Sequence, residues 1–97
     1  MPSYIAESFL SRTRRGELAS LTARARDAAQ ALAEKGQQVA YLRSAFIPED
    51  EVCLLWFIAP SRATVTELGR LAKLEFDRVV EELDPPPQEA SCAQVRV

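Results

Sequence analysis

The chain of 97 residues suits a single domain, which at this length buries roughly 60–70% of the surface that its unfolded form exposes. Its hydrophobic share of 47% and charged share of 27% are ordinary for a soluble globular protein. The net charge of -2 argues against a nucleic-acid binder, since such proteins usually carry a basic excess. The longest apolar run, Val52 to Pro60, is far shorter than the roughly 20 residues of a membrane span, and charges near the N-terminus argue against a signal peptide. We therefore expect a cytoplasmic protein with no nucleic-acid or membrane partner.

The chain contains no histidine. This excludes catalytic triads that rely on histidine and zinc or nickel sites built from imidazole. Catalysis would need a carboxylate, lysine, tyrosine or cysteine with a retuned pKa. We expect no cofactor and no metal site.

The first half of the chain predicts a strand and then a helix. Tyr4–Leu10 alternates two mixed faces, as a strand does. Residues Arg15–Lys35 are rich in strong helix formers and predict a helix ended by a left-handed cap at Gly36. Its apolar stripe consists of Leu18, Leu21, Ala25, Ala28 and Leu32.

The second half predicts a hairpin, a helix and a last strand. Strands at Gln38–Ile47 and Glu51–Ala59 flank a polar turn that opens with Pro48. Ser61 is a good N-cap for a helix to about Lys73, with Val65, Leu68, Leu71 and Ala72 as its apolar stripe. Glu75–Leu83 reads as a partly polar strand, with a helical continuation as the alternative.

These elements form the order β-α-β-β-α-β, which predicts a ferredoxin-like α+β sandwich over residues 1–84. Its four-stranded antiparallel sheet would carry both helices on one face, with the second hairpin strand beside the first strand. Residues 85–97, which begin with three consecutive prolines, are expected to form a disordered tail.

The run "VCLLWFIAP" is apolar at every position, so both faces of this strand avoid water. The two helices would cover one face and leave the other bare. Because exposed apolar patches usually mark interfaces or ligand grooves, we expect a homodimer that joins two sheets into a barrel-like pair.

A four-residue hairpin loop would set Ile47 opposite Val52 and Arg43 opposite Trp56. A slip of one residue would exchange the two faces. In this register the bare face consists of Tyr41, Arg43, Ala45, Leu54, Trp56 and Ile58, with Tyr41 across from Ile58 and Ala45 across from Leu54.

The charge of Arg43 on an apolar strand needs a carboxylate, an aromatic face or water. Glu7 is a candidate partner, and Trp56 offers a stacking surface between them. Arg43 would then either fix the register of a dimer through an ion pair or recognise an anion. Our leading hypothesis is a non-catalytic homodimer that binds a small anionic or aromatic ligand, or only a partner, through Glu7, Tyr41, Arg43 and Trp56.

Two other functions stay open at this point. A cofactor-independent enzyme of the cyclase, isomerase or oxygenase type would use Glu7 as base, Tyr41 as acid and Arg43 to stabilise an enolate-like anion. A divalent cation such as Mg²⁺ or Ca²⁺ would bind Glu7 and the acidic segment Glu81–Asp84.

Three further features invite simpler interpretations. Cys53 is expected to be a small buried hydrophobe and Cys92 an exposed bystander, which gives no disulfide framework. The basic run Arg12–Gly16 is expected to be a solvated loop, with a phosphate or an acidic partner as the alternative.

Four segments give the chain a family resemblance that covers Tyr4 to Leu83. They are "YIAESFL", "VAYLRSAFI", "CLLWFIAPS" and "LEFDRVVEEL", of which the "AP" before a helix and the L-x-x-D-R-[IV] pattern are the more specific. Together they resemble the DUF4242 family of small ferredoxin-like proteins. The resemblance implies a dimer formed through the sheets and a site on the sheet face, and the family includes a nickel-responsive, nickel-binding member.

The chain departs from that family at the site itself. Arg43 stands where members often carry histidine, Ile58 replaces a common carboxylate before "AP", and Glu75 replaces a usual proline, whereas Glu7 matches a family glutamate. Without histidine the nickel role does not transfer. The resemblance implies that the site here suits an anion, or no ligand.

Overall fold

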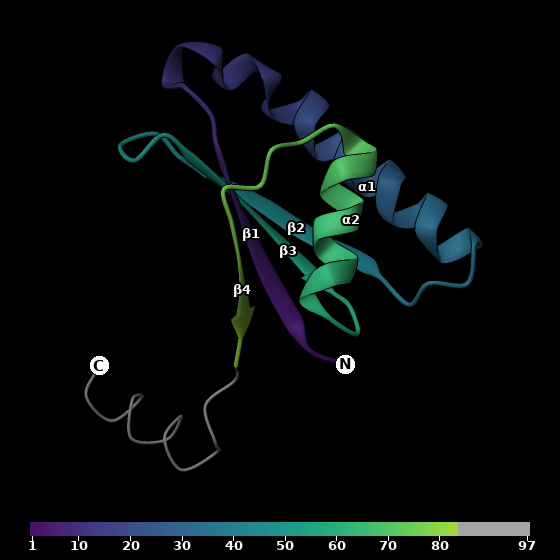
Figure 1. Ribbon diagram of the computed structural model, residues 1–97. Coiled ribbons are helices and arrows are strands. Elements are labelled where there is room, and N and C mark those ends of the chain that lie inside the picture. The colour runs from purple at the N-terminus through teal and green to yellow at the C-terminus, as the bar shows by residue number, and fades with distance from the viewer. Residues whose placement is uncertain (84–97) are drawn as a thin grey trace.

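The computed structural model describes residues 1–83, and the predicted tail at 85–97 and Cys92 lie outside them. The chain runs from a strand through a short 3₁₀ segment into a long helix, then through a hairpin and a second helix into a last strand (Figure 1). The elements are β1 Ser3–Phe9, η1 Arg12–Glu17, α1 Leu18–Glu34, β2 Ala40–Ile47, β3 Val52–Ile58, α2 Arg62–Ala72 and β4 Arg78–Glu82.

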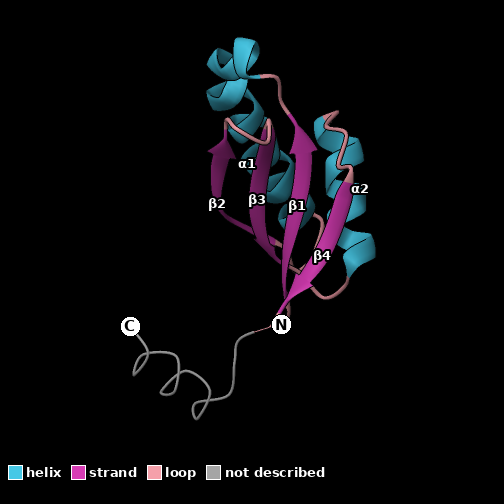
Figure 2. Ribbon diagram, turned by 90° about the vertical axis from the view of Figure 1, so that its left-hand side faces the viewer, coloured by secondary structure: helices cyan, strands magenta, loops and turns pink. Residues whose placement is uncertain are grey.

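The four strands form one antiparallel sheet in the order β2-β3-β1-β4. Both helices lie on the same side of this sheet (Figure 2). This arrangement confirms the predicted ferredoxin-like sandwich, with β3 in the centre beside β1. The opposite side, which we call the open face, is not covered by any element within residues 1–83.

The core lies between the sheet and the helices. Alternate residues of the central strand, Cys53, Leu55 and Phe57, are fully buried on this side. The predicted stripe of α1 is buried from Leu21 to Leu32, whereas Leu18 packs only partly against the core. In α2 the prediction failed at one position. Leu71 is 37% exposed because Val65, Leu68 and Ala72 make the buried face, joined by Gly69.

The predicted helix signals are confirmed in their local geometry. Gly36 follows α1 with a φ of +92°, a left-handed conformation that glycine adopts without steric cost. The hydroxyl of Ser61 accepts a hydrogen bond from the backbone N–H of Thr64 and caps α2. Helix α2 ends at Lys73, which has a φ of 57°, and the chain then leaves the helix. The helical continuation past this residue is therefore wrong.

The last strand is shorter than predicted because Asp77 ties the segment before it to β1. The backbone N–H of Asp77 donates to the carbonyl of Glu7 at 2.7 Å, and its carboxylate accepts from the N–H of Phe9 at 2.8 Å. Regular pairing of β4 with β1 begins only at Arg78. The second hairpin strand also begins one residue late, since Glu51 is left-handed with a φ of 51°.

The hairpin register holds at the turn and shifts farther along β2. Ile47 pairs with Val52 and Arg43 with Trp56, as predicted. The register then shifts between Tyr41 and Arg43, so that Tyr41 pairs with Phe57. The predicted pairing of Tyr41 with Ile58 is wrong, because an extra residue at this bulge turns the preceding side chain to the other face.

Gly69 allows α2 to approach the segment before β4. A Cβ atom at this position would lie 2.7 Å from Cδ2 of Phe76, whose ring contacts Phe57 at 6.2 Å between centroids. Adding a methyl group in a helix normally stabilises it, but here it would displace a packed ring. We expect Gly69→Ala to lower the free energy of unfolding by about 1–2 kcal/mol, measured by urea denaturation.

Gly16→Ala is the matched control for this prediction. No atom lies within 4 Å of a Cβ added at Gly16, and its backbone does not require glycine. We expect this change to leave stability unchanged or to raise it slightly. Equal stability of the two variants would contradict the proposed clash.

Candidate binding surface on the open face

The open face carries an apolar centre with charges around it. Residues that are paired across neighbouring strands lie on the same face of the sheet. The pairing of the four strands therefore identifies the residues of the open face. Most of the apolar ones are half-buried, while Phe9 is 61% exposed at one end. The face consists of Ser3, Ile5, Glu7, Phe9, Ala40, Arg43, Ala45, Ile47, Val52, Leu54, Trp56, Ile58, Arg78, Val80 and Glu82.

The guanidinium of Arg43 lies over the indole of Trp56. The Cζ atom of its guanidinium is 3.9 Å from the ring centroid, well within the range of a cation–π contact. The Nε1–H of the same indole donates to Oε2 of Glu82 at 3.4 Å. Trp56 is thus held from both sides, and it presents one ring face to the cation.

Glu7 does not reach Arg43. It pairs with Leu54 on one side and with Arg78 on the other, and its carboxylate lies 3.3 Å from Nε of Arg78. The expected partnership between Glu7 and Arg43 is therefore wrong, because β3 separates them and β4 supplies a nearer guanidinium. Within residues 1–83, Arg43 has no carboxylate within 4.0 Å.

Tyr41 belongs to the other side of the sheet. Its ring meets that of Phe57 edge-on at 5.9 Å between centroids, and Arg26 of α1 lies over it at 5.5 Å. Its hydroxyl shares a hydrogen bond of 2.7 Å with the hydroxyl of Ser44. Of the four predicted ligand residues, the open face therefore brings together Glu7, Arg43 and Trp56 but not Tyr41. The sheet separates Glu7, the suggested base, from Tyr41, the suggested acid. The enzymatic mechanism that combined these two residues is therefore wrong.

The acidic end of β4 is divided between the two faces. Glu81 pairs with Tyr4 and Glu82 with Ser3, so neighbouring carboxylates point to opposite sides. In the part of the chain that the structure describes, no three His, Cys, Asp or Glu side chains gather as a metal site. The hypothesis of a cation held by Glu7 and this segment receives no support from its geometry.

Arg78 and Glu82 also belong to the open face, although Arg78 was not among the predicted site residues and Glu82 was named only within the acidic segment Glu81–Asp84. Arg78, Val80 and Glu82 are alternate residues of β4 and therefore share one face, but the apolar and polar residues of "RVVEE" do not alternate. The register of β4 against β1 was the missing information. Only the contact of this strand with β1 brings Arg78 to Glu7 and Glu82 to the indole.

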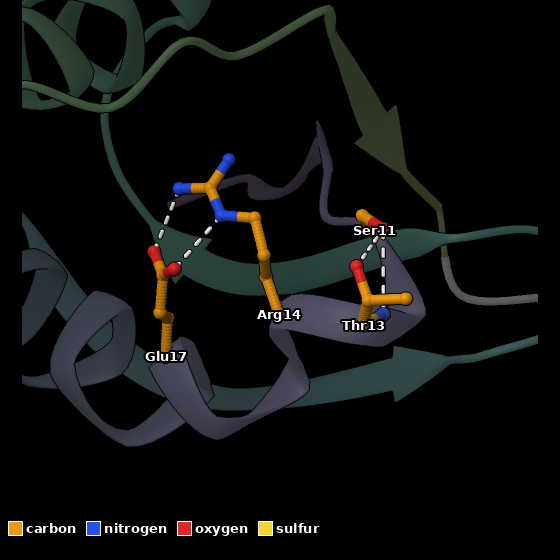
Figure 3. A network of polar contacts seen from close by, with 4 residues as sticks. All are labelled: Ser11, Thr13, Arg14 and Glu17. Atoms are coloured by element: carbon orange, nitrogen blue, oxygen red, sulfur yellow. Dashed lines mark hydrogen bonds and ion pairs between the residues drawn. The ribbon is translucent and has the colours of Figure 1, made fainter.

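The basic run at Arg12–Gly16 forms the exposed 3₁₀ segment η1 (Figure 3). The Ser11 side chain accepts a hydrogen bond from the N–H of Thr13. The guanidinium of Arg14 donates to both carboxylate oxygens of Glu17, at 2.8 and 2.7 Å, and thereby lowers the pKa of that carboxyl. This run is therefore a surface turn with one internal ion pair, as the simpler interpretation predicted.

Comparison with known proteins shows the fold alone. No family model and no curated protein matches the chain. The crystal structure of SCO4226 from Streptomyces coelicolor A3(2) matches with a TM-score of 0.66 and 16% sequence identity, over 87% of this chain and 99% of that one. No helix within residues 1–83 is long and apolar enough to cross a membrane.

Cys53 is fully buried in β3, which confirms its predicted place in the core. Burial raises the pKa of this thiol from 9.0 to about 11, because the thiolate loses its hydration. In a Cys92→Ser background we expect no labelling of native protein by a thiol reagent at pH 8, and full labelling in denaturant.

The same burial predicts a loss of stability in alkali. An unfolded thiol ionises near pH 9 and the folded one near pH 11, so the contribution of Cys53 is complete below pH 9 and declines as pH rises toward 11. Cys53→Ala should remove this part of the pH dependence of unfolding. Rapid labelling of the native thiol at pH 8 would contradict the burial.

Proposed function

We propose that this domain is a non-catalytic homodimer whose open sheet faces meet, and that a small organic anion binds between them against Arg43 and Trp56. The observation that supports the proposal most is the stack of the Arg43 guanidinium on the indole at 3.9 Å, without a carboxylate partner in residues 1–83. A planar guanidinium that lies on a ring keeps the N–H groups at its edge available for a carboxylate.

The apolar surroundings of Arg43 link the formation of the dimer to the binding of the anion. Leu54, Trp56 and Ile58 are only half-buried in the single chain, and a second sheet would remove them from water. The same closure would also remove the guanidinium from water. An unpaired buried charge is costly, so an anion that enters with the second copy lowers the free energy of association.

We also propose membership in the DUF4242 family. Support comes from the four resembling segments and from the ferredoxin-like architecture in which they lie. The nickel-binding role of a family member does not extend to this chain, which has no histidine. An arginine at the family's histidine position turns a site for a cation into one for an anion.

The proposal predicts that anions promote dimerisation. We expect sedimentation velocity to show a dimer at micromolar protein concentration, and benzoate to lower the dissociation constant of that dimer about tenfold or more. Trp56 is the only tryptophan in the chain, so its fluorescence should change in the same benzoate titration. A protein that stays monomeric at 100 micromolar, with and without benzoate, would exclude the proposal.

Arg43→Met separates the roles of charge and apolar area. The variant keeps the long side chain over the indole but removes the charge, so it should form a tighter dimer that no longer responds to benzoate. Arg78→Met is the matched control on the same face. It leaves the Glu7 carboxylate without its ion pair at 3.3 Å, so it should weaken the dimer while the benzoate response persists.

A further inference from the structure

Two cavities on the helix side of the molecule meet at Arg24 and Lys73. One is a groove of about 410 Å³ between α1 and α2, and the other is a polar pocket of about 450 Å³ at the end of β1. Both are lined by the same two cations, Arg24 from α1 and Lys73 directly after α2. We call these two neighbouring cavities together the interhelix site, and the volume of each falls in the range of small-molecule pockets.

The floor of the groove is apolar and formed by small side chains. Ala28 and Ala72 are buried, and the exposed Ala31 lines the same groove. Leu71, the one residue of the predicted α2 stripe that is exposed, also lines this groove. An aliphatic chain laid here would cover apolar surface that water now contacts.

The rim of the groove is mainly cationic. Arg24, Lys35 and Lys73 stand against the single carboxylate of Asp27. Neither Arg24 nor Lys73 has a carboxylate within 4.0 Å in the described part of the chain. The two cations that line both cavities are therefore not held in ion pairs within residues 1–83, although the charge of Arg24 also acts on the nearby carboxylate of Glu17.

The other charged residues of the polar pocket are one ion pair and two carboxylates. Arg14 and Glu17 neutralise each other through two hydrogen bonds (Figure 3). The carboxylate of Asp77 accepts the N–H of Phe9. Asp77 keeps its negative charge, and Glu75 adds a second one to this pocket. These two carboxylates disfavour a dianion such as phosphate and favour a single negative charge near Arg24 and Lys73.

The backbone of Lys73 is a second, independent indication. It occupies the left-handed region, with φ 57° and ψ 42°, at the helix cap where glycine is the usual residue. A residue with a Cβ atom is strained there, and such strain gathers at functional sites. The side chain that replaces glycine here is one of the two cations shared by the cavities.

We infer that the interhelix site binds a small amphipathic monoanion, with its carboxylate between Arg24 and Lys73 and its aliphatic body in the groove between α1 and α2. Charge selects the carboxylate, and the row of alanines with Leu71 selects an unbranched apolar body. This ligand site lies on the opposite side of the sheet from Arg43 and Trp56, and it goes beyond the proposed function.

Octanoate is the probe for this inference, and backbone amide NMR is the measurement. Titration into the full chain should shift the signals of residues 24–35 and 71–75 with saturation in the micromolar to low millimolar range. Octylammonium and acetate should produce no such shifts, since the first has the wrong charge and the second has no apolar body. Shifts confined to the open face, or no saturable shift with octanoate, would overturn the inference.

Two substitutions test the cations. Lys73→Gly removes the charge and suits the left-handed backbone, so the variant should keep or raise its melting temperature while the affinity for octanoate falls at least tenfold. Arg24→Gln should weaken binding similarly. Arg62→Gln, which removes a cation outside both cavities, should leave binding unchanged. Equal affinity of all three variants would overturn the role of the two cations.

A matched pair on α1 tests the groove. Ala31→Leu fills it from an exposed helical position, so the variant should fold normally and lose octanoate binding. Ala33→Leu makes the same change on the same exposed helix outside the groove and should bind as before. Arg43→Met should also bind octanoate normally at these helices, so failure of either proposal is recognised without reference to the other.

Discussion

The apolar character of both faces of β3 is the constraint on which the rest of the structure depends. This strand lies between β1 and β2, and its alternate residues point to opposite sides. Cys53, Leu55 and Phe57 are completely buried under the helices, so Leu54 and Trp56 necessarily lie on the other face. No register could place both sets in one core. The two helices cover one face of β3, and the apolar side chains of its other face lie on the open face.

Much of this fold could be predicted because its signals are local. Ser61 caps a helix through its own hydroxyl, and Gly36 ends one through its own backbone freedom. The alternation of the hairpin and the stripe of α1 need no knowledge of distant residues. A chain whose local signals agree with its topology reveals that topology in its sequence. Arg43 and Trp56 were accordingly paired correctly, since the turn at Pro48 sets that register.

The missed features depend on contacts between distant segments. Asp77 forms two hydrogen bonds with β1, and these contacts bring Arg78 next to Glu7. No local sequence pattern predicts them. The interhelix site requires α1 and α2 to lie side by side, which brings Arg24 and Lys73 to one cavity from positions far apart in sequence. The bulge in β2 contains no glycine or proline that would mark it.

That bulge decides which side chains can act together on the open face. An unbroken β2 would keep Tyr41 and Arg43 on the same side of the sheet. The extra residue, Leu42, instead turns Tyr41 toward the core, where its ring contacts Phe57 and its hydroxyl meets Ser44. Pairing is regular from Arg43 to the turn, so the guanidinium stays on Trp56. The open face thereby keeps Arg43 and Trp56 together but does not include Tyr41, the residue that the suggested enzymatic mechanism required as its acid.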